Sequence, residues 1–195
     1  MRRMMTAISL VLASAGMATA QDADGWTGFY AGFAADITAP EFDNSNLMTP
    51  LQENAAFGFY GGYNYALGDN FVVGAEVGVG GPVPFQTTLA GADFEYENSA
   101  NARLRGGYAI GNALIYGTFG YQVVNYGAAA GISTAGMADG LVYGVGIEVL
   151  LIDNVSFRLD YTSAHMNVEE GTIIGAPGDV QLDENAIALG VALHF

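Results

Sequence analysis

Large apolar residues occupy every second position at the end of this chain. In the last segment, NAIALGVALHF, the large side chains are Ile187, Leu189, Val191, Leu193 and Phe195, and the residues between them are small or polar. Side chains on a β-strand point alternately to its two faces, so this period is that of a strand with one apolar face. The segment is therefore expected to be a strand whose large side chains meet an apolar environment.

The same period returns along most of the chain. Eight segments alternate in this way, and they cover residues 26–37, 56–67, 70–80, 94–110, 112–127, 140–151, 154–164 and 185–195. Their lengths suit tilted strands that cross an apolar band of about 25 Å. Although 51% of the residues are hydrophobic, beyond residue 20 the sequence has no run of about 18 apolar residues that could form a transmembrane helix. The sequence thus predicts an all-β fold, an eight-stranded antiparallel up-and-down transmembrane β-barrel.

The connections between these segments alternate between short and long. The short ones, at 66–70, 110–112 and 151–154, are rich in Gly, Asp and Asn, as tight turns are. The long ones are polar and cover about 38–55, 81–93, 127–139 and 165–184. Short periplasmic turns and long extracellular loops are typical of outer-membrane barrels, and this order would place both mature termini on the periplasmic side.

The first twenty residues have the features of a bacterial signal peptide. Arg2 and Arg3 precede an apolar stretch, and Ala18-Thr19-Ala20 forms a cleavage site before Gln21. We therefore expect a signal peptide at 1–20 and one outer-membrane barrel domain at 21–195, in the cell envelope of a Gram-negative bacterium.

The mature chain is strongly acidic. It contains 20 acidic residues, three arginines and no lysine, a net charge of −17. Nucleic acid is excluded as a partner, because so few cations cannot neutralise phosphates. The chain has no cysteine and only two histidines, so we expect no disulfide, no metal site and no cofactor.

Several stretches resemble the small eight-stranded outer-membrane barrels of the opacity-protein and OmpA-type, or porin, family. They are WTGFYAG, GFYGGYNYALGDNFVVGAEVG, ARLRGGYAIGNALIYGTFGY and the terminal ALHF. In that family, a final Phe after alternating apolar residues resembles the signal that the outer-membrane assembly machinery reads. The resemblance implies that Phe195, Leu193 and Val191 form such an assembly signal and that the last strand closes against the first.

All three arginines of the mature chain fall in the inward phase of the predicted strands. Three acidic residues of the same phase lie at a similar distance from the periplasmic ends of their strands, and the six residues are Glu76, Arg103, Arg105, Glu148, Arg158 and Asp160. Buried charges persist only when they are paired. We therefore expect one network across the lumen, with Arg103 and Arg105 beside Glu76, and with Arg158 and Asp160 beside Glu148. Such a network would either plug the lumen, which in an eight-stranded barrel is narrow enough for side chains to fill, or form a gate or an ion path.

Two further site types are weaker. Ser163, His165 and Glu169 or Glu170 contain the residue types of an outer-membrane lipid A deacylase, but in the reverse order to that family's H-x-S motif. Acidic residues in the long connections could attract Ca²⁺ or Mg²⁺, but they show no calcium-loop spacing. We expect no catalytic residues.

The sequence therefore favours a structural or surface-interaction role, in envelope integrity or adhesion. A narrow porin-like channel for small solutes is the first alternative, and a lipid A-modifying enzyme is the second. The expected partners are outer-membrane lipid and lipopolysaccharide, the assembly machinery and an unknown surface ligand, and the chain is expected to be a monomer.

Overall fold

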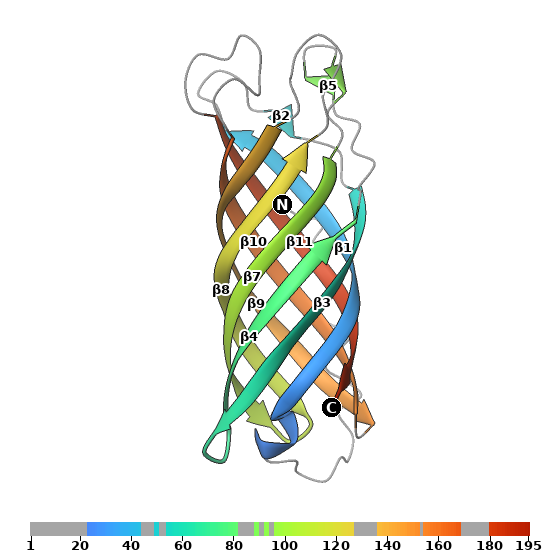
Figure 1. Cartoon of the computed structure of the whole chain (residues 1–195), viewed down its shortest axis with the longest axis vertical. Coiled ribbons are helices and arrows are strands. Elements are labelled where there is room, and N and C mark those ends of the chain that lie inside the picture. Colours follow the sequence, from blue (N-terminus) through green and yellow to red (C-terminus); the bar gives the residue numbers. More distant parts are fainter. Residues whose placement is uncertain are drawn as a thin grey trace.

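The computed structural model describes residues 23–43, 49–50, 54–81, 88–89, 92–93, 96–126, 136–152, 154–168 and 180–195. Eight long strands form a closed antiparallel barrel, which confirms the predicted fold (Figure 1). They are β1 (Gly28–Asp43), β3 (Asn54–Leu67), β4 (Phe71–Gly80), β7 (Tyr96–Ile110), β8 (Ala113–Tyr126), β9 (Gly136–Ile152), β10 (Val155–Val168) and β11 (Val180–His194). Each strand pairs with its neighbour in the chain, and β11 pairs with β1 to close the barrel.

Three shorter strands and one short helix complete the described structure. Strand β2 (Thr49–Pro50) pairs with β1, and β5 (Thr88–Leu89) pairs with β6 (Ala92–Asp93). The 3-10 helix η4 (Ala23–Trp26) precedes β1. Within the part of the chain that the structure describes, no helix is long and apolar enough to cross a bilayer.

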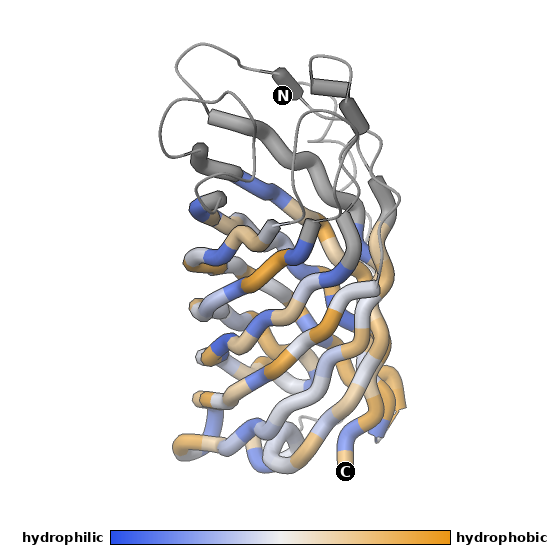
Figure 2. The backbone as a smooth tube through the Cα atoms, turned by 45° about the horizontal axis from the view of Figure 1, so that its top comes forward, coloured by the Kyte–Doolittle hydropathy of each residue, from blue (hydrophilic) through white to orange (hydrophobic). Residues whose placement is uncertain are grey.

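The two faces of the barrel wall follow the predicted alternation. Large apolar side chains such as Phe59, Leu104 and Val145 are exposed on the outside, whereas Tyr60, Arg105 and Leu114 are buried in the lumen. Figure 2 shows this alternation as apolar and polar segments that change from residue to residue along each strand. The outward face is thus a band of aliphatic and aromatic side chains suited to lipid.

Four strands extend further than the alternation predicts. Strand β1 continues to Asp43, β9 begins at Gly136, β10 continues to Val168 and β11 begins at Val180. The extra residues continue the backbone ladder, as in the pairing of Asp43 with Gln181. Hydropathy alternation marks only the part of a strand that has one apolar face, so a polar stretch such as TAPEFD pairs without showing it. The expected segment 94–110 begins in the structure at Tyr96, and Phe94 and Glu95 lie outside the described residues.

One end of the barrel, here called the turn end, contains the three tight turns, η4 and the C-terminus (Figure 1). Each turn ends in an asparagine whose carbonyl accepts a hydrogen bond from the next long strand. The bonds are Ala109 N to Asn70 O (2.7 Å), Leu150 N to Asn112 O (2.9 Å) and His194 N to Asn154 O (2.8 Å). These contacts join neighbouring hairpins at the rim.

Trp26 does not begin the first strand, as the segment 26–37 had predicted. It lies in η4, which folds under the barrel and is held by a bond from Ala23 N to Asp69 O (3.0 Å). The Trp26 side chain is fully buried in a cluster at the turn end, whose other buried members are Ala23, Val72, Ala109, Leu114, Tyr116 and Leu150. Helix η4 therefore closes the lumen at the turn end.

The seam between the first and last strands depends on a glycine. Gly28 has a φ of 143°, and a methyl group there would lie 2.3 Å from the carbonyl oxygen of Phe195. Phe195 N in turn donates to Phe29 O at 2.8 Å. A residue with a side chain would strain the backbone at Gly28 and push the C-terminus away.

The outward placement of Val145 leads to a stability prediction. Val145→Arg should lower the free energy of unfolding in lipid vesicles by about 2–4 kcal/mol, because it places a charge near the midplane of the apolar band. Leu151→Arg, on the same strand and also exposed but at the turn end, should cost only about 0–1 kcal/mol. Equal losses for the two variants would contradict this placement of the membrane.

Candidate functional site in the lumen

The six charged residues expected in the lumen all lie there. Glu76 is on β4, Arg103 and Arg105 are on β7, Glu148 is on β9, and Arg158 and Asp160 are on β10. Each side chain of this lumen charge cluster is at most 10% exposed. Their charges sum to zero, so the cluster can remain ionised if its members are close enough to pair.

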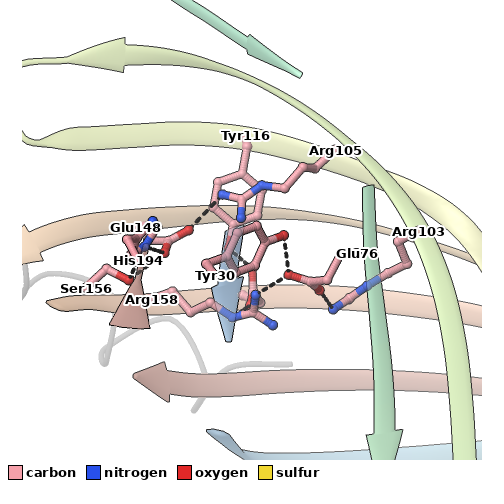
Figure 3. Close-up of polar contacts among 10 residues, drawn as sticks. Tyr30, Glu76, Arg103, Arg105, Tyr116, Glu148, Ser156, Arg158 and His194 are labelled. Carbon is pink, nitrogen blue, oxygen red and sulfur yellow. Dashed lines mark hydrogen bonds and ion pairs between the residues drawn. The ribbon is translucent and has the colours of Figure 1, made fainter. Parts of the chain in front are cut away.

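Glu76 is the centre of one half of the cluster (Figure 3). It accepts from Arg103 on the neighbouring strand, from Arg158 Nη1 at 2.6 Å and from the hydroxyl of Tyr30 at 3.0 Å. Glu76 and Arg103 are direct cross-strand partners, whereas Arg158 reaches Glu76 from β10, on another part of the wall. Three donors thus surround one buried carboxylate.

Glu148 is the centre of the other half (Figure 3). It accepts from Arg105 Nη2 at 2.7 Å and from Ser156 Oγ at 2.6 Å. His194 Nε2 lies 3.1 Å from the same carboxylate, and since an ionised carboxylate only accepts, the histidine is the donor. The indole ring of Trp26 packs edge-on against His194, with ring centres 5.7 Å apart. This half of the cluster therefore joins the wall to the cap formed by η4.

Two of the three arginines, Arg105 and Arg158, bind a different glutamate from the one expected from the sequence. Arg103 contacts Glu76 as expected, but Arg105 bonds to Glu148 instead. Glu148 and Arg158 face each other in the register of β9 and β10, yet the guanidinium of Arg158 pairs with Glu76 and lies 2.8 Å from Asp160. Two of the ion pairs, Arg105–Glu148 and Arg158–Glu76, therefore run across the lumen and connect strands that are not neighbours.

Tyrosine rings fill the space between the charges. The guanidinium of Arg158 lies 3.4 Å from the ring centre of Tyr60, and that of Arg105 lies 4.0 Å from the ring centre of Tyr116. The Tyr116 hydroxyl also donates to Asp160. Inward glycines make room for these rings, since a methyl group at Gly32 would lie 2.4 Å from the Tyr60 ring. Cation–π contacts of this kind are worth about 2 kcal/mol or more when desolvated.

Several members of the site could not be identified from their residue type. Ser156 and His194 complete the shell of Glu148, although neither residue was predicted from the sequence to belong to the site. The sequence did indicate that both side chains point into the lumen, because both residues fall in the inward phase of their strands. Trp26, the only tryptophan, was expected to begin a strand, and nothing in the sequence indicated a cap.

The residues considered for catalysis are arranged differently from a catalytic triad. His165 lies 2.7 Å from Asp183 Oδ1 and 2.9 Å from the Tyr143 hydroxyl, on the outside of the barrel. Ser163 is on the same strand and makes no hydrogen bond with His165 in the described structure, and Glu169 and Glu170 fall outside the described residues. Among the residues that the structure describes, no three His, Cys, Asp or Glu side chains are grouped so that they could hold a metal ion.

The proposed assembly residues lie at the turn end of β11. Val191, Leu193 and Phe195 point outward, and each is at least 47% exposed. Val191 and Leu193 pair with Phe33 and Ala31 on β1 across the closing seam. Their side chains are therefore accessible from the lipid side.

An antiparallel barrel with an apolar outer wall and a charged, filled lumen defines the class of membrane-spanning β-barrels. The family model described as "Outer membrane protein beta-barrel domain" matches residues 8–195. The chain therefore belongs to this outer-membrane β-barrel family.

Individual relatives agree with this assignment. The "22 kDa outer membrane protein" of Rhizobium leguminosarum bv. viciae is 24% identical over 184 residues, which cover 91% of this chain and 82% of the relative. Neisserial surface protein A is 14% identical with a TM-score of 0.56, covering 87% of this chain and 98% of that one. Ail, the attachment invasion locus protein of Yersinia pestis, is 12% identical with a TM-score of 0.54, covering 86% and 99%. OprG of Pseudomonas aeruginosa is 14% identical with a TM-score of 0.54, covering 87% and 96%. These structures share the fold.

The exchange of partners leads to a test by double-mutant cycles. For Arg105→Ala and Glu148→Ala, the coupling in the free energy of unfolding should be about 0.5–3 kcal/mol, as for residues in direct contact. The matched control is Arg158→Ala with Glu148→Ala, a pair that faces each other in register but shares no ion pair. Its coupling should be smaller. A larger coupling for the control pair would mean that each arginine binds the carboxylate beside it on the wall.

Proposed function

We propose that the protein is a non-catalytic outer-membrane barrel with a structural or surface-interaction role, and that its lumen is closed. The observation that carries this proposal is the lumen charge cluster, in which two carboxylates, Glu76 and Glu148, bind arginines from across the barrel. Tyr30, Tyr60 and Tyr116 pack among the arginines, and Trp26 covers the turn end. Such dense filling supports a plug more than a path for solutes.

The proposed orientation places the turn end in the periplasm. Outer-membrane barrels have short periplasmic turns and longer extracellular loops, and the tight turns lie at the same end as the C-terminus. The long connections would then face the outside, where they would carry envelope contacts or adhesion to a surface ligand. We also propose that residues 1–20 direct export of the chain to the outer membrane. There the barrel would be a monomer embedded in lipid and lipopolysaccharide.

Conductance of the refolded chain in a planar bilayer tests the closed lumen. The native protein should conduct poorly, and Arg103→Ala with Arg105→Ala should raise the single-channel conductance, because the double variant removes two side chains and admits water. It should also unfold at lower denaturant, since breaking a buried pair costs about 3–5 kcal/mol.

The pore alternative makes the opposite prediction for the same measurement. Free conduction by the native protein, with no increase in the double variant, would reject the plug and support a narrow porin-like channel. Arg2→Ala with Arg3→Ala removes the same number of arginines outside the proposed mature barrel, so the refolded full-length variant is the matched control.

The last residues are proposed to be the assembly signal. Deleting Phe195 should reduce insertion into the outer membrane and leave aggregated or degraded protein in the periplasm, as measured by membrane fractionation. Phe195→Tyr, which keeps an aromatic terminus, should insert normally. Normal insertion of the deletion variant would refute the signal.

A further inference from the structure

The outward face of the barrel wall changes from apolar to polar toward the end opposite the turn end. On β10 the outward residues pass from Leu159 to His165, and on β11 they pass from Leu189 to Asp183. Leu141 of β9 is the cross-strand partner of His165. At a rise of about 3.3 Å per residue and a tilt of about 40°, the stretch of β9 from Leu151 to Leu141 climbs about 25 Å. That is the height of the apolar band, so the change occurs at the level of the lipid headgroups.

A pocket of about 480 Å³ lies on the outer face at this level. Its lining combines the ring of Tyr121 and the aliphatic side chain of Leu141 with three polar side chains, those of His165, Asn167 and Asp183. Leu141 pairs with Tyr121 on one side and with His165 on the other, and Asp183 continues the row on β11. The volume is in the range of about 300–1,000 Å³ that small-molecule sites occupy.

Hydrogen bonds hold the polar side chains of this pocket in place. His165 Nδ1 lies 2.7 Å from Asp183 Oδ1, and the Tyr143 hydroxyl lies 2.9 Å from His165 Nε2. Since an ionised carboxylate only accepts, Nδ1 is the donor, and the imidazole ring is held from both sides. The Tyr121 hydroxyl in turn donates to Asp139. Side chains that are already oriented lose little conformational entropy when a ligand binds.

The charge of the chain determines which part of a lipid headgroup can bind here. Beyond residue 20 the sequence has no lysine, and its three arginines, Arg103, Arg105 and Arg158, pair with glutamates in the lumen. No lysine or arginine is therefore available on the outer face for a lipid phosphate, and the carboxylates of Asp139 and Asp183 would repel one. Sugar hydroxyls suit the pocket better, because they donate to a carboxylate and exchange hydrogen bonds with an amide.

We infer that this pocket binds the sugar headgroup of a glycolipid in the outer leaflet. The sugar hydroxyls bond to Asp183 and Asn167, and the C–H groups of the sugar ring pack against Tyr121 and Leu141. The acyl chains of the same lipid continue along the apolar wall toward Val145. The inference rests on the proposed surface-interaction role and on the proposed orientation, and it names the lipid group that the surface recognises.

The test is binding of a monogalactosyl diacylglycerol, a lipid with sugar hydroxyls and no phosphate, to the refolded barrel in phosphatidylcholine nanodiscs. The backbone amide signals of Leu141, Asn167 and Asp183 should shift and saturate as this lipid is added. Phosphatidic acid, which has a phosphate and no sugar, should leave them unchanged. Asp183→Asn should weaken binding of the galactosyl lipid about tenfold or more, as expected when a hydrogen bond to a charged group is lost. Asp69→Asn, the same change in an exposed turn at the other end, should bind this lipid like the native chain.

Tyr121 provides a second, independent pair of variants. Tyr121→Phe keeps the ring and should retain binding of the galactosyl lipid, whereas Tyr121→Ala removes the ring and should weaken binding. Heat-modifiable gel mobility shows whether each variant is folded. The inference is wrong if no amide signal saturates, or if phosphatidic acid produces the same shifts. It is also wrong if Asp183→Asn and Asp69→Asn bind the galactosyl lipid equally, or if Tyr121→Ala binds it like Tyr121→Phe.

A single cysteine separates failure of this inference from failure of the proposed orientation. The sequence has no cysteine, so Asn167→Cys can be labelled selectively with a membrane-impermeant maleimide on intact cells. Labelling on cells without binding of the galactosyl lipid in nanodiscs would reject the pocket and leave the orientation standing. Binding in nanodiscs without labelling on cells would reject the orientation, and with it the outer-leaflet lipid.

Discussion

The bilayer leaves the backbone no partner but itself, and the architecture of this protein follows from that constraint. In hydrocarbon, every N–H and C=O group must be paired within the protein, so a sheet can cross only if it has no free edge. Strands β1 and β11 meet this condition by pairing from Tyr30 with His194 to Asp43 with Gln181. Gly28 allows the C-terminal carbonyl to approach the seam.

Closure with eight strands makes the lumen narrow, and a narrow lumen determines how charge can be kept inside it. Arg105 and Arg158 cannot reach water, so each needs a carboxylate within direct reach. Both find one across the barrel, at Glu148 and Glu76. Such cross-lumen pairs connect distant parts of the wall, which neighbouring-strand pairs would not do. They also leave the volume above them to small residues.

Alternation in the sequence was sufficient to predict the number of strands, their order and which residues point inward. It predicted the lumen position of Glu76 and Arg158 because inward phase is a local property of a strand. It could not predict which carboxylate each arginine binds, since Arg158 faces Glu148 in register but reaches Glu76. That choice depends on side-chain length and on the tyrosines between them. The strand ends were also missed where polar residues pair. The cap at Trp26 was missed because a single helical turn is too short to show a periodic pattern of apolar residues.

The central claim, that the arginines are held in pairs across a closed lumen, can be tested by nitrogen NMR of the guanidinium groups in nanodiscs. Beyond residue 20 the sequence contains only three arginines, so each can be assigned by substitution. The account predicts that the guanidinium protons of Arg105 and Arg158 exchange slowly with water. Glu148→Gln should release Arg105 but leave Arg158 protected. Guanidinium protons that exchange as fast as those of free arginine, or an Arg105 signal that is unaffected by Glu148→Gln, would contradict it.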